Sequence, residues 1–154
     1  MKKLLLVSLI TVFFISCSGF ANAQTKQCSE ENSLVSIRSV KSGHVEELVF
    51  IFKKPVSAGV EASSASAPFT DYGGEKVNVK GDHFKRIVFK GVAWMCDTKI
   101  YIKFPSLLIA DIQETERFEG QIEYIIGLKA GVVYLKQYSM ETATYKKVIF
   151  KFRK

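Results

Sequence analysis

Short stretches in which apolar and polar residues alternate, separated by turn residues, recur along most of this chain. Residues 145–153 are an example, with Val148, Phe150 and Phe152 expected on one face and mostly basic residues on the other. Stretches of this kind at a spacing of about 8–12 residues are typical of packed antiparallel sheets. The sequence therefore predicts an all-β fold, an antiparallel β-sandwich or partly open barrel of about nine short strands.

Three stretches refine this prediction. The continuous apolar run at residues 48–52 indicates a strand that is covered on both faces. Residues 99–104 alternate cleanly and predict another strand. Residues 107–117 fit either a helix with one apolar stripe or an edge strand, and we favour the strand because no other segment has a helical period.

The most distinctive stretch, residues 118–128, reads as a turn, a strand and a second turn. Apolar residues at positions 122, 124 and 126 alternate with their neighbours, which predicts a strand with one buried face. Gly120 and Gly127 bound this strand. Glycine at such places indicates backbone with positive φ or a close approach between two segments.

The chain begins with the pattern of an export signal. Lys2 and Lys3 precede an apolar run at residues 4–15, and Ala21-Asn22-Ala23 forms a cleavage site. We expect a signal peptide at 1–23, a polar N-terminal segment at 24–33 and a single β domain at 34–154. The mature protein is then exported to the periplasm or the extracellular space.

A lipid anchor is the alternative to soluble release. Residues 14–17 form a loose lipobox ending in Cys17, which could carry acyl chains and make the protein an outer-membrane lipoprotein. In that case alone we expect membrane contact.

Beyond residue 23 there are 20 basic and 15 acidic residues, a net charge of +5. A modest positive charge permits attraction to anionic envelope polymers or lipid headgroups. We favour a simpler interpretation, in which the basic C-terminus is the solvated face of an edge strand protected by lysines. That cluster consists of Lys146, Lys147, Lys151, Arg153 and Lys154.

Cys28 and Cys96 are the two cysteines of the mature chain, and in an oxidising compartment they most simply form one disulfide. The bond would close a loop of about 68 residues and could stabilise the fold by about 4 kcal/mol. Their spacing fits neither a metal site nor a redox motif.

Several glycines and apolar strands also match a family pattern. The matching residues are Gly43 with the run 48–52, then Gly74, Val77, Val79 and Gly81, then Phe118-Glu119-Gly120 with Tyr124 and Gly127-Leu128, and a closing strand at 148–150. In these residues the chain resembles the AMIN-like domains, small secreted or lipid-anchored bacterial proteins. The resemblance implies a β-sandwich without an assigned activity, related to AMIN modules that hold proteins at the cell wall. Glu46-Glu47 stand where the family usually carries an Asp-Arg pair.

Motifs that would indicate catalysis or a metal site are lacking in this sequence, so we expect no enzyme activity, no cofactor and no metal. The absence of a basic stripe interleaved with aromatic residues argues against nucleic acid. A candidate binding surface consists of Tyr72, Trp94, Glu119 and Tyr124. The aromatic residues could equally belong to the core, and Glu119 could serve only to accept backbone N–H groups in its turn.

The function expected from these observations is that of a non-enzymatic cell-envelope module that binds peptidoglycan or an envelope protein. Two alternatives remain. The many phenylalanines and the strand count suit a barrel-like carrier of a small apolar ligand. A weaker alternative is an inhibitor of a secreted hydrolase, which a mature charge of about +5 disfavours against basic host lysozymes.

Overall fold

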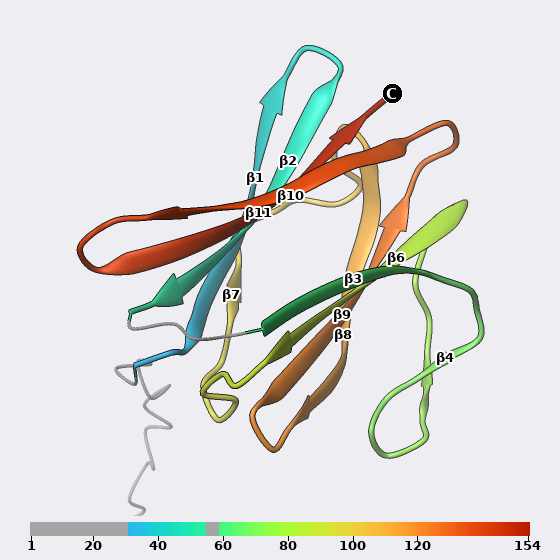
Figure 1. Cartoon of the computed structure of the whole chain (residues 1–154). Coiled ribbons are helices and arrows are strands. Elements are labelled where there is room, and N and C mark those ends of the chain that lie inside the picture. Colours follow the sequence, from blue (N-terminus) through green and yellow to red (C-terminus); the bar gives the residue numbers. More distant parts are fainter. Residues whose placement is uncertain (1–30, 55–58) are drawn as a thin grey trace, which may run out of the picture.

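The computed structural model describes residues 31–54 and 59–154, which form two sheets packed face to face and a small third sheet (Figure 1). Across the first sheet lie β10 (Val133–Glu141), β11 (Tyr145–Arg153), β2 (Val45–Lys53), β1 (Leu34–Ser42) and β7 (Lys99–Ile100). Across the second lie β3 (Gly59–Ala65), β6 (His83–Lys90), β9 (Gln121–Leu128) and β8 (Ile109–Phe118). The third pairs β4 (Phe69–Thr70) with β5 (Lys76–Val77).

The all-β prediction is confirmed, because the antiparallel sheets pack as a sandwich and do not close into a barrel. The described residues contain eleven strands where the sequence predicted about nine. The pairing of β1 with β7 is the parallel exception among these strands. The predicted signal peptide, Cys17 and Cys28 lie outside the described residues.

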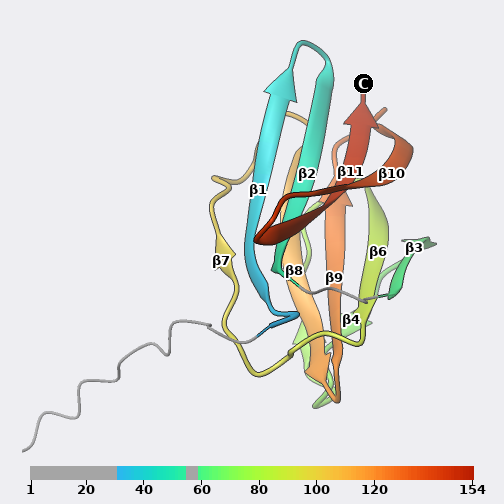
Figure 2. The ribbon, with the colours of Figure 1, turned by 60° about the vertical axis from the view of Figure 1, so that its left-hand side comes forward.

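Aromatic rings from both sheets fill the space between the two layers seen in Figure 2. The ring of Phe89 on β6 lies 4.8 Å from that of Phe50 and 4.9 Å from that of Phe52, both on β2. Phe150 on β11 meets Phe50 edge to face at 5.6 Å. Tilted and edge-to-face contacts of this kind add to the stabilisation that burial provides.

Two ambiguous stretches are now resolved. Residues 107–117 form most of strand β8, so the preference for a strand over a helix is confirmed. Residues 99–104 were predicted to be one strand, but pairing ends after Ile100, and the chain then leaves the sheet. The alternation of residues 101–104 arises because Ile102 and Phe104 pack on the core from the side of the sandwich.

The basic C-terminal strand is not an edge strand, so that prediction is wrong. β11 lies between β10 and β2 and forms hydrogen-bonded ladders with both. Its lysines therefore do not protect an edge, because the edge strands of this sheet are β10 and β7.

The strand at 121–128 is buried on both faces, whereas the sequence predicted one buried face. On the outer face Ile125 is covered by a flap, by which we mean residues 66–80 with β4 and β5. Phe69 and Val79 of the flap pack on Ile125, and Phe69 meets the ring of Phe84 edge to face at 5.0 Å. The alternation of the sequence could not reveal the flap, because the covering residues lie far away in the chain.

Two glycines of this strand have the backbone roles that the sequence predicted. Gly120 has φ +80° in the turn before β9. Where the flap returns to the sheet it crosses β9 so closely that a Cβ on Gly127 would lie 1.8 Å from the carbonyl oxygen of Lys80.

One fully buried carboxylate ties the loop before β8 to the first sheet. Glu46 on β2 accepts hydrogen bonds from the Ser106 hydroxyl and, at 2.6 Å, from the Leu108 N–H. Lys129 Nζ donates to the Ser106 carbonyl at 2.5 Å, on the same loop. A buried charge is tolerated when it is hydrogen-bonded in this way. Glu46 thus has a structural role at the position where the chain departs from the AMIN-like pattern.

Candidate functional site

The turn between β8 and β9 projects from one end of the sandwich. Phe118 pairs with Gln121, and the two residues between them have positive φ, +47° at Glu119 and +80° at Gly120. Two such residues define the type I′ turn that suits the twist of a hairpin. Glycine adopts this conformation freely, whereas a glutamate there is strained by about 1 kcal/mol.

The flap brings Tyr72 to the same end. Its turn is closed by hydrogen bonds between Asp71 and Glu75, including one from the Glu75 N–H to the Asp71 carboxylate at 2.8 Å. β8 shifts register between Glu114 and Glu116, which leaves the Thr115 carbonyl outside the ladder. The N–H of Tyr72 donates to this carbonyl at 3.1 Å and so anchors the flap beside Phe118.

The third segment is residues 91–98, which leave β6 and cross the end of the sandwich with Trp94 and Met95. The Val92 N–H donates to the Gly120 carbonyl at 3.0 Å, which ties the segment to the hairpin turn. Arg117 on β8 also donates to the Trp94 carbonyl at 3.2 Å and to the Cys96 carbonyl.

Arg117 is held in turn by Glu114, with Nε–Oε1 and Nη2–Oε2 distances of 2.6 Å each. Burial alone would lower the pKa of Arg117, but the hydrogen bond and the charge of Glu114 outweigh burial and raise it. Arg117 therefore stays charged and positions the carbonyls around Trp94.

These segments assemble what we call the end platform: Tyr72, Trp94, Met95 and Phe118, with Glu119 beside them. Tyr72 stacks on Phe118 with a centroid distance of 4.7 Å and an interplanar angle of 25°, and Trp94 tilts against Phe118 at 5.7 Å. Tyr72 is 67% exposed and Met95 is 76% exposed.

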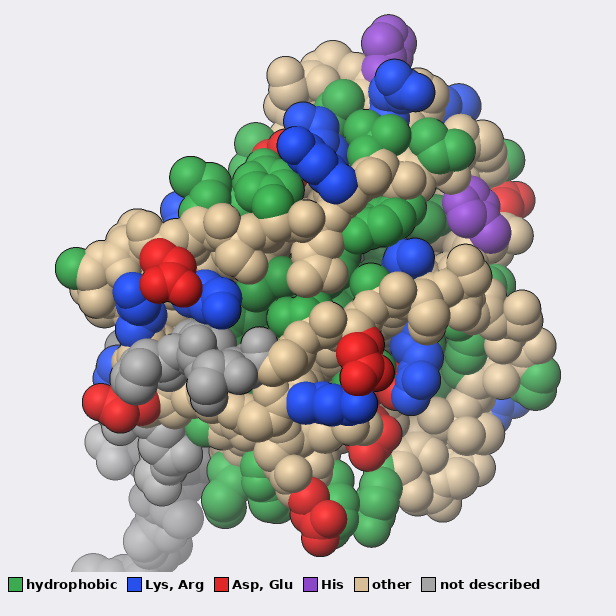
Figure 3. Space-filling model, viewed as in Figure 1, with side chains coloured by type: hydrophobic (Ala, Val, Ile, Leu, Met, Phe, Trp, Pro, Cys, Tyr) green, Lys and Arg blue, Asp and Glu red, His purple; other side chains and the backbone are tan. Residues whose placement is uncertain are grey.

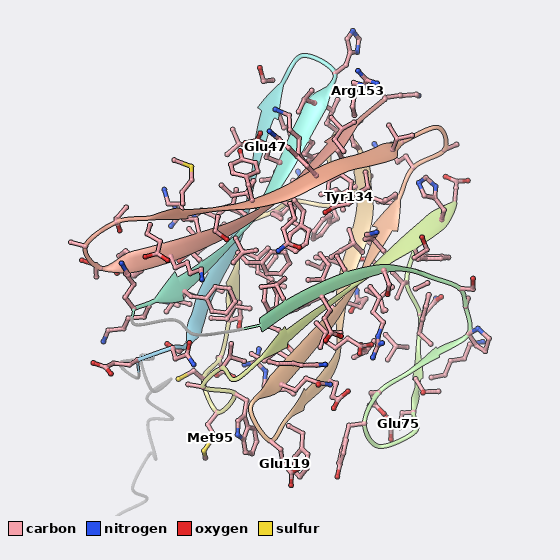
Figure 4. All side chains as sticks on the ribbon, viewed as in Figure 1. Glu47, Glu75, Met95, Glu119, Tyr134 and Arg153 are labelled. Atoms are coloured by element: carbon pink, nitrogen blue, oxygen red, sulfur yellow. The ribbon has the colours of Figure 1, made fainter. Side chains whose placement is uncertain are left out.

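Figure 3 shows hydrophobic side chains gathered at this lower end of the molecule around an acidic one. In Figure 4 Met95 and Glu119 point away from the body at the same end. The exposed Tyr72 ring and the half-buried rings of Trp94 and Phe118 together form a surface on which a flat apolar face can stack.

Three of the four residues named as a candidate binding surface thus come together, and the fourth does not. Tyr124 is 1% exposed and belongs to the core, so it is not a surface residue. Its hydroxyl donates to Glu114 at 2.7 Å. Burial, followed by the charge of Glu114, raises the pKa of Tyr124 above its usual value. Its place in the strand alternation, opposite Phe50 in the core, decides this burial.

The sequence reasoning missed Phe118 and Met95 as platform members and Arg117 as the residue that positions them. Phe118 had been noted only as part of the family pattern. Arg117 and Glu114 are three residues apart, and in a regular strand side chains at this separation point to opposite faces. They meet here because β8 has a bulge at Thr115, which the sequence does not indicate. No described residue donates a hydrogen bond to the Glu119 carboxylate, so it remains open to solvent.

Cys96 lies within the segment 91–98, is buried and takes part in a disulfide. Its pairing with Cys28 stays a prediction, because Cys28 is not among the described residues. A bond at this point would fix the segment that carries Trp94.

Reactive groups do not gather at the platform. Within residues 31–54 and 59–154, no three His, Cys, Asp or Glu side chains are grouped so that they could hold a metal ion. The platform residues offer flat apolar rings and one open carboxylate, a combination that suits recognition of a ligand.

The fold and the platform define a two-sheet β-sandwich with an aromatic end surface. Comparison with models of known protein families gives no match, and searches of curated proteins and of solved structures also give none. The resemblance to AMIN-like domains therefore stays a prediction. Across the part of the chain that the structure describes, no helix is long and apolar enough to span a membrane.

Proposed function

We propose that this chain is an exported, non-enzymatic module of the cell envelope that holds the glycan of peptidoglycan on the end platform. The observation that carries the proposal is the stack of the exposed Tyr72 ring on the half-buried ring of Phe118, with the half-buried Trp94 tilted beside it. Sugar rings have one face of C–H groups that packs on aromatic rings, while their hydroxyls need acceptors such as the free carboxylate of Glu119.

The rigidity of the platform supports this proposal. Tyr72, Trp94 and Phe118 come from separate segments, and each segment is tethered through a backbone group. Binding then requires little ordering of loops, which reduces the entropic cost of association. The strained glutamate at position 119 also supports a functional role, since strained residues cluster at binding sites.

The test is a pull-down on purified, insoluble peptidoglycan. We expect the protein to be retained, and Trp94→Ala and Tyr72→Ala each to reduce the affinity roughly tenfold, equivalent to about 1.4 kcal/mol. Tyr145→Ala is the matched control, because this exposed tyrosine begins β11, a strand of the other sheet. Retention no greater than that of the denatured protein would remove the proposal.

An envelope protein is the second candidate partner, and Met95 is the observation that favours it. Methionine side chains are common on protein-binding surfaces because they adapt to the partner, and Met95 is 76% exposed. A glycan partner, which stacks on the rings of the platform, predicts that Met95→Ser reduces peptidoglycan retention much less than Tyr72→Ala does. A protein partner predicts that Met95→Ser weakens crosslinked capture of that partner, with Tyr145→Ala as control.

The other two hypotheses gain less support. A carrier needs an enclosed cavity, and the space between the sheets is occupied by Phe50, Phe52, Phe89 and Phe150 in ring contact. An inhibitor of a basic lysozyme would have to bring together two positively charged molecules.

A further inference from the structure

The outer face of the first sheet carries a set of cations that the end platform does not use. Residues paired across a sheet point to the same side, so the register shows which side chains share this face. Four consecutive rows cross it: Met140–Lys147–Ile51–Ser36–Lys99, Tyr138–Ile149–Val49–Arg38, Lys136–Lys151–Glu47–Val40 and Val133–Arg153–Val45–Ser42. We call these rows the basic face.

The positive charge of the protein is concentrated on this face. The described residues include 19 basic and 14 acidic side chains, a net charge of +5. The basic face holds six basic residues and one acidic residue, also +5, so the remaining 13 basic and 13 acidic side chains cancel. A net charge gathered on one face produces a stronger local potential than the same charge spread evenly.

Most of these cations have no acidic partner among the described residues. Lys151 forms an ion pair with Glu47, at 3.2 Å. No acidic group among the described residues pairs with Arg38, Lys99, Lys136, Lys147 or Arg153. Arg38 instead lies over the Tyr101 ring at 4.8 Å from its centroid.

Apolar side chains lie among the cations. Val49 and Ile149 share the side of the sheet that carries the cations, and they are only 7% and 3% exposed. Around this apolar centre Val40, Val133 and Met140 are 55%, 48% and 55% exposed. A surface that only had to attract a hydrophilic polyanion would not need these exposed apolar groups, whereas an interface of headgroups and acyl chains accommodates both kinds.

We propose that the basic face docks on the surface of a bilayer rich in anionic lipids. Arg38, Lys99, Lys136, Lys147, Lys151 and Arg153 contact the headgroups, and Val40, Val133 and Met140 reach the boundary of the acyl region. The contact requires no acyl chain at Cys17 and is separate from the end platform. Glu47 and Arg153 of the face lie toward the end of the molecule opposite Met95 and Glu119 (Figure 4). A protein docked in this way could still present the platform.

The test is sedimentation with vesicles, using the chain from residue 24, which contains every described strand and lacks Cys17. Vesicles of phosphatidylglycerol and phosphatidylethanolamine should bind the protein at 0.1 M salt, and phosphatidylcholine vesicles should not. Each cation near an anionic surface strengthens partitioning about fivefold. The triple variant Lys136→Gln/Lys147→Gln/Arg153→Gln should therefore bind ~100-fold more weakly.

The matched control is Lys76→Gln/Lys80→Gln/Lys90→Gln, which removes the same charge from exposed lysines outside the basic face. Its loss of affinity for the anionic vesicles should be less than one tenth of the fold-loss of the first triple variant. Equal losses would overturn the proposal, because they would indicate attraction to net charge alone. Binding to long-chain polyphosphate without binding to the anionic vesicles would also overturn it. Trp94→Ala should leave vesicle binding unchanged.

Discussion

Replacing Gly127 by alanine should be among the most damaging single substitutions in this protein. The added Cβ would lie 1.8 Å from the carbonyl oxygen of Lys80, where real contacts essentially never fall below 3.0 Å, so the two backbones must move apart by at least 1.2 Å. That movement disrupts the hydrogen bonds from the Lys80 N–H to Asp111 at 3.2 Å and from the Asp82 N–H to Leu128 at 2.8 Å. Each bond is worth about 1 kcal/mol.

The flap also loses packing, because Val79 follows the same backbone and covers Ile125 with Phe69. Partial exposure of these side chains adds about 1–2 kcal/mol. Together the terms predict a loss of about 3–4 kcal/mol in the free energy of unfolding, a large part of the 5–15 kcal/mol typical of a domain.

Urea unfolding followed by circular dichroism and by the fluorescence of Trp94, the only tryptophan, measures this loss. Gly131→Ala is the control, because Gly131 has φ +75° but nothing within 4 Å of an added Cβ. It should cost about 1 kcal/mol from backbone strain alone. A Gly127→Ala variant no less stable than Gly131→Ala would refute the reasoning that the crossing is rigid.

Three further predictions concern charge and strain. Glu119→Asn should raise the free energy of unfolding, measured in urea, by about 0.5–1 kcal/mol, because asparagine suits the positive φ. The same substitution should reduce peptidoglycan retention. A loss of stability would contradict the strain argument. Arg86→Met removes the guanidinium that donates to the buried carboxylate of Glu123 at 2.8 Å, and it should lower the free energy of unfolding by about 1–3 kcal/mol. Lys90→Met breaks the exposed ion pair with Glu61 and should lower it by less than about 0.5 kcal/mol. Equal losses would show that burial of the pair is irrelevant. The raised pKa of Tyr124 means that the unfolded chain loses this proton first, near pH 10, so stability is complete below that pH and falls above it by about 1.4 kcal/mol per unit. The urea midpoint of Tyr124→Phe should fall less between pH 9 and pH 11 than that of the unmodified protein, and an equal fall would contradict the assignment.

The sequence was sufficient for the all-β class and for the strand at 107–117, because alternation is a local property that directly reports a half-buried strand. It also identified Gly120 and Gly127 as special backbone positions. It could not reveal that Ile125 is covered, since Phe69 and Val79 reach it through a flap whose position depends on tertiary contacts.

Part of the candidate site could be predicted, because residue type and turn position are also local properties of the sequence. Tyr72, Trp94 and Glu119 could be named from residue type and turn position, but no local pattern indicates that three distant segments meet at one end. Tyr124 was assigned to the surface because an aromatic residue suggested recognition, although its own alternation with Ile122 and Ile126 indicated the core. The basic C-terminal strand was wrongly predicted to be an edge strand, because strand order is not written in the sequence of one strand.

The Thr115 bulge has a consequence for how this protein could change. The flap is attached at this point through main-chain atoms, the Tyr72 N–H and the Thr115 carbonyl, and the neighbouring segment is attached through the Val92 N–H. These attachments persist whichever side chains occupy positions 72 and 94. The exposed ring at position 72 can therefore be exchanged for another without loss of the scaffold, whereas a replacement for Trp94 must also keep its packing against the core. Selectivity for a new ligand is thus open to evolution and to engineering first at position 72.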